Sequence, residues 1–355
     1  KEIFEQPTAI RETIGSRFRL GEKCSFDDIE FTKEYLSSIN RIFIVACGTA
    51  MHAGLVGKNL FEKLCQIPTE VDIASEFRYR NPIIDKHTLC IYISQSGETA
   101  DTIAALKLAK SKGAKTLAIS NVIGSSITRE ADYSIYTHAG PEIAVASTKA
   151  YTSQVVLVAI LAMHFAEVLG SVENKTIEEL KSDIIDLPSK IEQILDNTSQ
   201  IKEFAKKTYT EKDMFFLGRG TDYNVALEGS LKLKEISYIH SESYAAGELK
   251  HGTISLVEDG MPVIGVATQT ELLEKTVSNI VEVKSRGAFT IAVCKEGTEF
   301  SEGVIDEAIE VPAMEDVLMP MLTVIPLQLI AYYTTVLKGL NVDKPRNLAK
   351  SVTVE

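Results

Sequence analysis

The chain has 355 residues, a length that allows two domains of ordinary size. Its composition, 45% hydrophobic and 24% charged, is that of a water-soluble globular protein. The formal net charge of −12 argues against nucleic acid and membranes as partners, so a site for an anionic ligand must be locally neutral or positive. Five scattered cysteines indicate reduced core thiols and a cytoplasmic location. No leader peptide and no apolar stretch of membrane length are expected.

Apolar runs alternate with helix-sized segments in the first half of the chain. The candidate strands there are 41–47, 88–94, 115–120 and 133–137. This alternation predicts a parallel sheet with helices on both faces. The same alternation returns in the second half, where the candidate strands are 214–218, 262–267, 289–294 and 308–311.

The remaining segments are helical or irregular by pattern. Between the halves, the charged and periodic segment 176–207 predicts connecting helices that are interrupted at Pro188. A further helix is predicted over 321–338. The last residues, 340–355, carry little pattern of their own, and a frayed end is the ordinary interpretation of such a terminus.

An internal repeat relates the two halves. The segment "FIVACGTAMHAGLVGKNLFEKL" (43–64) aligns with "FFLGRGTDYNVALEGSLKLKEI" (215–236), and "KSKGAKTLAIS" (110–120) aligns with "KSRGAFTIAVC" (284–294). The two matches are nearly collinear, because their offsets are 172 and 174 residues. We therefore predict a duplicated α/β domain of three layers, a parallel sheet between two layers of helices. The predicted domains are 1–180 and 181–355.

A cluster of hydroxyl and amide side chains lies between the strand 88–94 and the helix expected after it. Its members are Ser94, Gln95, Ser96 and Thr99. At a helix start the first N–H groups have no internal partner and the macrodipole is positive, so this turn could bind a phosphate. An ordinary N-cap would explain only one of these residues. The equivalent segment 266–276 has no glycine, which favours one phosphate site over two.

Other candidates for chemistry are charged residues. Glu228, Lys232 and Glu235 share one stripe of a predicted helix, as either a solvated face or a proton-transfer site facing a cavity. His251 lies in a glycine-flanked loop, a position used by catalytic and by structural histidines. The segment 142–154 is either an N-cap cluster or a second wall of a polar site. No metal-ligand spacing and no dinucleotide- or ATP-binding motif is present.

Six short segments are distinctive: "CGTAMHAG", "SEFRYRNP", "SQSGETADT", "EIAVASTKAYTSQ", "YAAGELKHG" and "PRNLAKSVTVE". Together they resemble the isomerase portion of the glucosamine-6-phosphate synthases, and the resemblance runs from end to end. Members of that family contain two sugar isomerase (SIS) domains, in agreement with the repeat. The resemblance implies an aldose–ketose isomerase that acts on fructose 6-phosphate in amino-sugar biosynthesis, without a cofactor or metal.

The resemblance also implies a role for each matching residue. Ser94, Gln95, Ser96 and Thr99 would bind the substrate phosphate, while Thr49, Val145, Ser147 and Ala349 would contact the sugar. Glu235 would move the proton between C1 and C2, Lys350 would form a Schiff base with the open-chain ketose, and Lys232 and Glu228 would support them. His251 would assist ring opening, entering from the neighbouring subunit of a homodimer. Ala50 stands where some members have serine, so a hydroxyl contact is missing there.

The family resemblance finally implies what the chain does by itself. Members carry an N-terminal glutaminase domain that supplies ammonia, and the start of this chain, "KEIFEQPTAIRETI", resembles the region just past it. We therefore expect fructose 6-phosphate to be converted to glucose 6-phosphate, with no glucosamine 6-phosphate made from glutamine. The alternatives are a free-standing SIS isomerase or deaminase and a sugar-phosphate-sensing regulator. Glu235, His251 and Lys350 together disfavour the regulator, which needs only the phosphate site.

Overall fold

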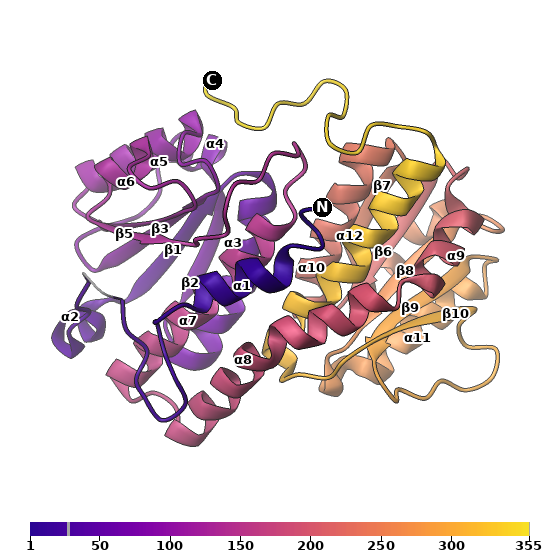
Figure 1. Ribbon diagram of the computed structural model, residues 1–355, viewed down its shortest axis with the longest axis horizontal. Helices are drawn as coiled ribbons and strands as arrows, with labels where there is room; N and C mark the ends of the chain where they lie inside the picture. The colour runs from indigo at the N-terminus through magenta and orange to yellow at the C-terminus, as the bar shows by residue number, and fades with distance from the viewer. Residues whose placement is uncertain (27–28, 355) are drawn as a thin grey trace.

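Two five-stranded sheets organise the computed structural model, which describes residues 1–26 and 29–354 (Figure 1). The first sheet contains β1 (Arg41–Ala46), β2 (Thr69–Ile73), β3 (Thr88–Ser94), β4 (Lys115–Ser120) and β5 (Tyr133–Tyr136). The second contains β6 (Asp213–Gly218), β7 (His240–Ala245), β8 (Pro262–Ala267), β9 (Phe289–Lys295) and β10 (Glu307–Val311). Neighbouring strands are parallel throughout both sheets. The predicted α/β class is confirmed.

The strand orders confirm the duplication. They are β2-β1-β3-β4-β5 and β10-β9-β8-β6-β7, which is one order when each sheet is numbered from its own first strand. The two strands that the sequence did not predict, β2 and β7, occupy equivalent edges. Their sequences, "TEVDI" and "HSESYA", lack an apolar run because an edge strand exposes much of its length to solvent.

The helices fill the connections between strands. In chain order they are α1 (Gln6–Ile14), α2 (Lys33–Ser38), α3 (Gly48–Cys65), α4 (Ala74–Phe77), α5 (Ala100–Ser111), α6 (Ser126–Glu130), α7 (Lys149–Leu169), α8 (Asn174–Asp196), α9 (Ser199–Thr208), α10 (Thr221–Ser237), α11 (Leu273–Lys284) and α12 (Pro320–Leu337). Short 3₁₀ turns cover Ala246–His251, Thr253–Leu256, Thr270–Leu272 and Asp316–Leu318. The helix predicted over 321–338 corresponds to α12.

The predicted interruption at Pro188 is wrong, because α8 continues through that residue and ends only at Asp196. A proline inside a helix removes one backbone hydrogen bond and crowds the preceding turn. Ile184, Leu187 and Ile191 are buried around Pro188, and this apolar face keeps the helix intact. The chain breaks instead at residues 197–198, before α9.

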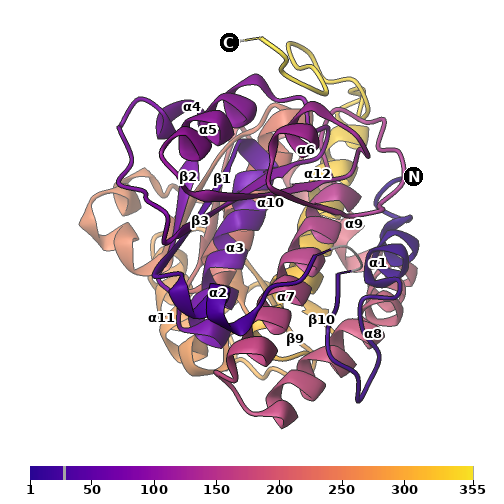
Figure 2. The same ribbon diagram turned by 90° about the vertical axis from the view of Figure 1, so that its left-hand side faces the viewer.

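Alternate residues of β1 pack on opposite faces of the first sheet. Ile42 and Ile44 belong to the same hydrophobic cluster as residues of α3 and α7. Phe43 and Val45 belong to a second cluster with residues of α4, α5 and α6. Figure 2 shows these helices covering the two sides of the sheet. The layers are therefore helix, sheet and helix, as predicted.

Helices α3, α7, α10 and α12 pack against one another between the two sheets. Their apolar residues form a hydrophobic cluster that also includes strand residues of both sheets, such as Ile44 and Ile264. Residues 149–169 and 316–337 are long and apolar enough to span a membrane, contrary to the sequence expectation. However, 78% and 89% of these windows are buried in the protein, so their apolarity reflects the core of the fold.

The segment after α12 is irregular but held in place. It crosses from the second sheet's half to the first along the upper edge in Figure 1. The Val145 N–H donates to the Asp343 carbonyl (3.0 Å), the Arg346 N–H donates to the Tyr238 hydroxyl (2.7 Å), and the Ala100 N–H donates to the Val352 carbonyl (3.2 Å). The expectation of a frayed end is therefore wrong, and we refer to residues 340–354 as the C-terminal tail.

Close packing of α10 on α12 gives a test of this core. A Cβ added at Gly229 would lie 2.6 Å from Leu327 Cδ1 and 3.0 Å from Leu327 Cβ. Overpacking a dense core costs about 1–3 kcal/mol, so Gly229→Val should lower the free energy of unfolding by about that amount. Urea denaturation measures the loss. Lys234→Ala, on the exposed side of α10, is the control and should change stability little. An unchanged midpoint for Gly229→Val would contradict the packing.

Candidate active site

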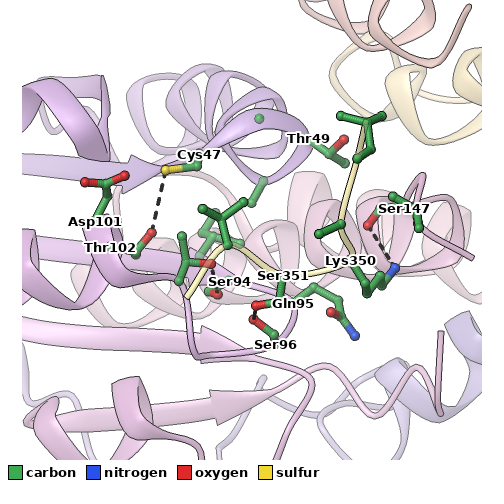
Figure 3. A pocket seen from close by; sticks show the side chains of 18 of the residues that line it. Cys47, Thr49, Ser94, Gln95, Ser96, Asp101, Thr102, Ser147, Lys350 and Ser351 are labelled. Carbon is green, nitrogen blue, oxygen red and sulfur yellow. Dashed lines mark hydrogen bonds between the residues drawn. The ribbon is translucent and has the colours of Figure 1, made fainter. Parts of the chain in front are cut away.

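A cavity of 360 Å³ opens at the carboxyl ends of β1 and β3. These strands are neighbours, and the chain leaves them toward opposite edges of the sheet, a topology that places ligands at this point in α/β proteins. The lining comes from the turn after β1, the turn after β3, the loop before α7, the helices α7 and α10, and the C-terminal tail. Figure 3 shows the tail residues Lys350 and Ser351 lying between these walls.

The turn after β3 gathers hydroxyl groups around the start of α5. The Gly97 N–H donates to Ser94 Oγ (3.0 Å), and Ser94 Oγ lies 3.3 Å from Thr99 Oγ1. Gly97 has a φ of +68°, and a Cβ there would lie 2.1 Å from Ser125 Oγ, so only glycine fits. Thr99 is the N-cap residue of α5, but its side chain caps no N–H group within the described helix. A side-chain N-cap therefore does not explain Thr99. The Ser96 hydroxyl accepts the Glu98 N–H (3.2 Å) and lies 3.1 Å from Ser351 Oγ of the C-terminal tail.

A charged network lies behind the cavity, where α10 meets α3. The Glu228 carboxylate contacts His52 Nδ1 (2.7 Å), Thr49 Oγ1 (3.1 Å) and Lys232 Nζ (3.4 Å). Lys232 Nζ also donates to Thr49 Oγ1 (2.9 Å) and pairs with Glu235 Oε2 (2.6 Å). The side chains of Glu228 and Lys232 are 0% and 2% exposed, so the interpretation as a solvated face is wrong.

Opposite charges keep this buried pair ionised. Burial alone would raise the pKa of Glu228, but the Lys232 charge and the hydrogen bonds from His52 and Thr49 hold that pKa below its usual value. Burial likewise acts to lower the pKa of Lys232, yet the carboxylates of Glu228 and Glu235 raise it overall. Glu235 and Thr49 connect the network to the cavity, and 23% of the Glu235 side chain is exposed.

Most of the predicted site residues meet in this cavity. Its lining includes Thr49, Ser94, Gln95, Ser96, Thr99, Val145, Ser147, Glu235, Ala349 and Lys350. Glu228 and Lys232 lie directly behind it through their contacts with Thr49 and Glu235. His251 is exposed at the end of the Ala246–His251 turn and is not among the described residues that line the cavity. Its role through a neighbouring subunit stays a prediction. Ala50 also lines the cavity, without a hydroxyl.

Two buried residues of the site were missed from the sequence. His52 is the hydrogen-bond partner of Glu228, and Glu142 pairs with Lys350 (Glu142 Oε2 to Lys350 Nζ, 2.8 Å). The repeat held a signal for His52, because its counterpart on α10 is Asn224. Asn224 Nδ2 likewise crosses between the two helices and donates to the Leu55 carbonyl (3.1 Å). Glu142 begins the segment 142–154, which the sequence offered as an N-cap cluster or a second wall of a polar site, but its pairing with Lys350, 208 residues away, was not predicted.

In the second half, a carboxylate of the protein itself binds the N–H groups of the turn after β8, which is equivalent to the turn after β3. The Asp222 carboxylate accepts the Thr268 N–H (2.7 Å), the Thr268 hydroxyl (2.5 Å) and the Gln269 N–H (3.2 Å). Asp222 corresponds to Ala50 in the repeat, so an internal carboxylate occupies the place where the first half has a methyl group. This arrangement supports the prediction of one phosphate site.

Comparisons with known proteins agree with this geometry. The SIS domain family model matches residues 35–164 and 207–338, one match in each half, so the chain contains two SIS domains in tandem. The predicted division at residues 180 and 181 stays a prediction. The C-terminal domain of glucosamine-fructose-6-phosphate aminotransferase from Francisella tularensis is 39% identical, with a TM-score of 0.91 and 97% of each chain covered. The chain belongs to the family that these aminotransferase C-terminal domains form.

Curated relatives extend the comparison. Glutamine–fructose-6-phosphate aminotransferase (isomerizing) from Clostridium tetani is 61% identical over the whole chain, and that from Caldanaerobacter subterraneus is 58% identical. The chain spans 58% of the length of each. A glucosamine-6-phosphate deaminase structure from Thermotoga maritima, 22% identical with a TM-score of 0.75, shares the fold.

The buried carboxylate of the second half predicts a pH dependence. Burial raises the pKa of Asp222 from 3.8 to about 6, so the folded protein keeps this proton through a range in which the unfolded chain releases it. The free energy of unfolding should therefore fall as pH rises from about 4 to about 6, by an amount on the order of 2–3 kcal/mol. The Asp222→Asn variant should lack this pH-dependent fall. Urea titrations of both proteins between pH 4 and 7 measure the difference. A difference that does not change with pH would contradict the assignment.

The charged network predicts a strong dependence on each partner. Glu228→Gln leaves the Lys232 ammonium buried with less compensation, which should lower the free energy of unfolding by about 3–5 kcal/mol. Replacing both groups together, as Glu228→Gln with Lys232→Met, should recover part of this loss because no uncompensated charge remains at Lys232. Thermal unfolding of the three variants tests the coupling. Additive losses in the double variant would show that the two groups do not interact.

Proposed function

We propose that this chain is the sugar-phosphate isomerase part of a glutamine–fructose-6-phosphate aminotransferase, with fructose 6-phosphate as its substrate. The observation that carries the proposal is the shared cavity, in which the hydroxyl-lined turn of β3, the Glu235 carboxylate and the Lys350 amine line one space of 360 Å³. Such a reaction requires a place to bind the substrate phosphate, an acid–base residue and an amine nucleophile.

The phosphate of the sugar would bind at the start of α5. Ser94, Gln95, Ser96 and Thr99 surround this point, and the N-terminal end of the helix adds a positive potential. A neutral site of this kind binds an anion without a fixed cation, which suits a chain of net charge −12. Thr49, Val145, Ser147 and Ala349 then face the rest of the sugar.

Lys350 and Glu235 would carry the chemistry. Lys350 Nζ gives up one proton and attacks the C2 carbonyl of the open-chain ketose as a free amine. The C–O bond then breaks, the oxygen leaves as water after taking up that proton and a second one from Nζ, and a protonated imine remains. Ammonia, or water where no ammonia is supplied, then replaces Nζ at C2. The Glu235 carboxylate next takes a proton from C1 and delivers it to C2. With ammonia the product is glucosamine 6-phosphate, and with water it is glucose 6-phosphate. Lys232, 2.6 Å from Glu235, stabilises the ionised base.

Further parts of the proposal come from the family resemblance of the sequence motifs. In the full-length protein a glutaminase domain would supply the ammonia, and a homodimer would bring His251 of one subunit to the site of the other for ring opening. We infer a cytoplasmic enzyme, in keeping with five cysteines that all carry free thiols. An amino-sugar deaminase is the second candidate, favoured only by the shared fold of the Thermotoga protein.

Activity of the 355 residues by themselves tests the proposal. Fructose 6-phosphate should be converted to glucose 6-phosphate, and Lys350→Ala should lower kcat by roughly two orders of magnitude while fructose 6-phosphate binding stays measurable. A coupled dehydrogenase assay measures turnover, and calorimetry measures binding. Lys344→Ala, an exposed lysine of the same tail, is the matched control and should keep full activity.

The same assay separates the alternatives. Ammonia release from glucosamine 6-phosphate at a rate rivalling isomerisation would favour the deaminase. Binding of fructose 6-phosphate without any turnover would favour a sensor. A Lys350→Ala variant with an unchanged kcat would remove Lys350 from the mechanism.

A further inference from the structure

We propose that Glu142 is a positioning residue that holds the ammonium group of Lys350, and with it the C-terminal tail, at the cavity. Lys350 Nζ lies 2.8 Å from Glu142 Oε2, 2.8 Å from the Ala144 carbonyl oxygen and 3.4 Å from Ser147 Oγ. Three oxygens from one loop therefore surround the three donors of the ammonium group. Of these oxygens, only those of Glu142 carry a charge.

The carboxylate in this arrangement is rigid. The Glu142 side chain is 0% exposed, and Oε1 accepts the N–H groups of Thr148 (2.7 Å) and Ala150 (3.2 Å) at the start of α7. The helix N-terminus favours a negative charge at this position. Oε2 is then left to pair with Lys350, so one oxygen fixes the carboxylate while the other holds the lysine.

The loop that carries Glu142 is itself fixed from two sides. The Glu2 carboxylate accepts the N–H groups of Ile143 and Ala144 from the N-terminal side. The Val145 N–H donates to the Asp343 carbonyl of the tail (3.0 Å). These contacts leave the ammonium group with one defined location, at the edge of the cavity that Ser147 and Lys350 both line.

The other contacts of the C-terminal tail near Lys350 are weaker. Immediately after Lys350, Ser351 Oγ lies 3.1 Å from Ser96 Oγ, and the Val352 carbonyl accepts the Ala100 N–H. Both contacts are single neutral hydrogen bonds, which are weaker than a charge-assisted one. The Glu142–Lys350 pair is therefore the strongest attachment of residues 348–352, and its loss should release them from the cavity. Arg346 is held separately, by the Tyr238 hydroxyl and ring.

This inference rests on the proposed function only where it concerns reaction with the sugar. The test variant is Glu142→Gln, whose amide oxygen still accepts the N–H groups of α7 while the charge is lost. Glu178→Gln is the matched control, because Glu178 also accepts a backbone N–H (Gly21, 2.7 Å) and a lysine (Lys181, 3.0 Å) far from the tail. Thermal unfolding first shows that both variants fold.

Hydrogen exchange of the sugar-free protein provides the first readout. Amides of residues 348–352 should exchange about tenfold faster in Glu142→Gln than in the parent protein or in Glu178→Gln. Lys350→Ala should have the same effect. The double variant should exchange no faster than either single variant, since both remove one interaction. Unchanged exchange in Glu142→Gln, or additive effects in the double variant, would overturn the proposal.

Covalent trapping provides the second readout. Borohydride reduces an imine between fructose 6-phosphate and Lys350 to a stable amine, which mass spectrometry detects on the tail peptide. The trapping rate at saturating sugar should fall about tenfold in Glu142→Gln, with the half-saturating sugar concentration within about twofold, because the phosphate turn is untouched. An unchanged trapping rate would overturn the positioning role. Absence of trapping in the parent protein would refute the proposed Schiff base, while the exchange experiment would still decide the Glu142–Lys350 contact.

Discussion

The buried ion pair of Glu228 and Lys232 is the constraint on which the site depends. Two charged groups are tolerated away from solvent only where their other hydrogen-bonding atoms also have partners. Here those partners come from both halves of the chain. His52 and Thr49 on α3 belong to the first half, whereas Glu228, Lys232 and Glu235 belong to α10 of the second. The network therefore fixes how the two domains meet, and the same contact brings Glu235 to the cavity of the first domain.

Duplication explains this design, and divergence explains why there is one site. In each half the first strand is followed by a Gly-Thr turn and a helix, and these two helices, α3 and α10, pack together near the centre of the molecule. In the first half the turn after β3 is lined with hydroxyls and left open. In the second half Asp222 neutralises the corresponding N–H groups from within the fold. In the proposed function, one copy thus binds the ligand, while the other contributes acid–base groups from its helix.

Sequence patterns predicted the parts of the structure that depend on local or repeated signals. The buried strands of both sheets follow from apolar runs, and the domain duplication from two collinear matches. The edge strands β2 and β7, the unbroken α8 and the ordered tail were not predicted, because each depends on tertiary contacts. The same holds at the site: Ser94 to Thr99 form a contiguous motif, whereas Glu142 meets Lys350 across 208 residues. The spacing of Glu228 and Lys232 predicted that they share one face of a helix but not that this face is buried.

The C-terminal tail contacts the groups at which we propose that the phosphate binds. Ser351 shares a hydrogen bond with Ser96, and the Val352 carbonyl takes the first N–H of α5. Under the proposed function, a sugar phosphate must therefore displace these tail contacts to reach the cavity. Substrate entry and product release would then depend on how often the C-terminal tail detaches, so turnover would be limited by a local opening motion rather than by bond making.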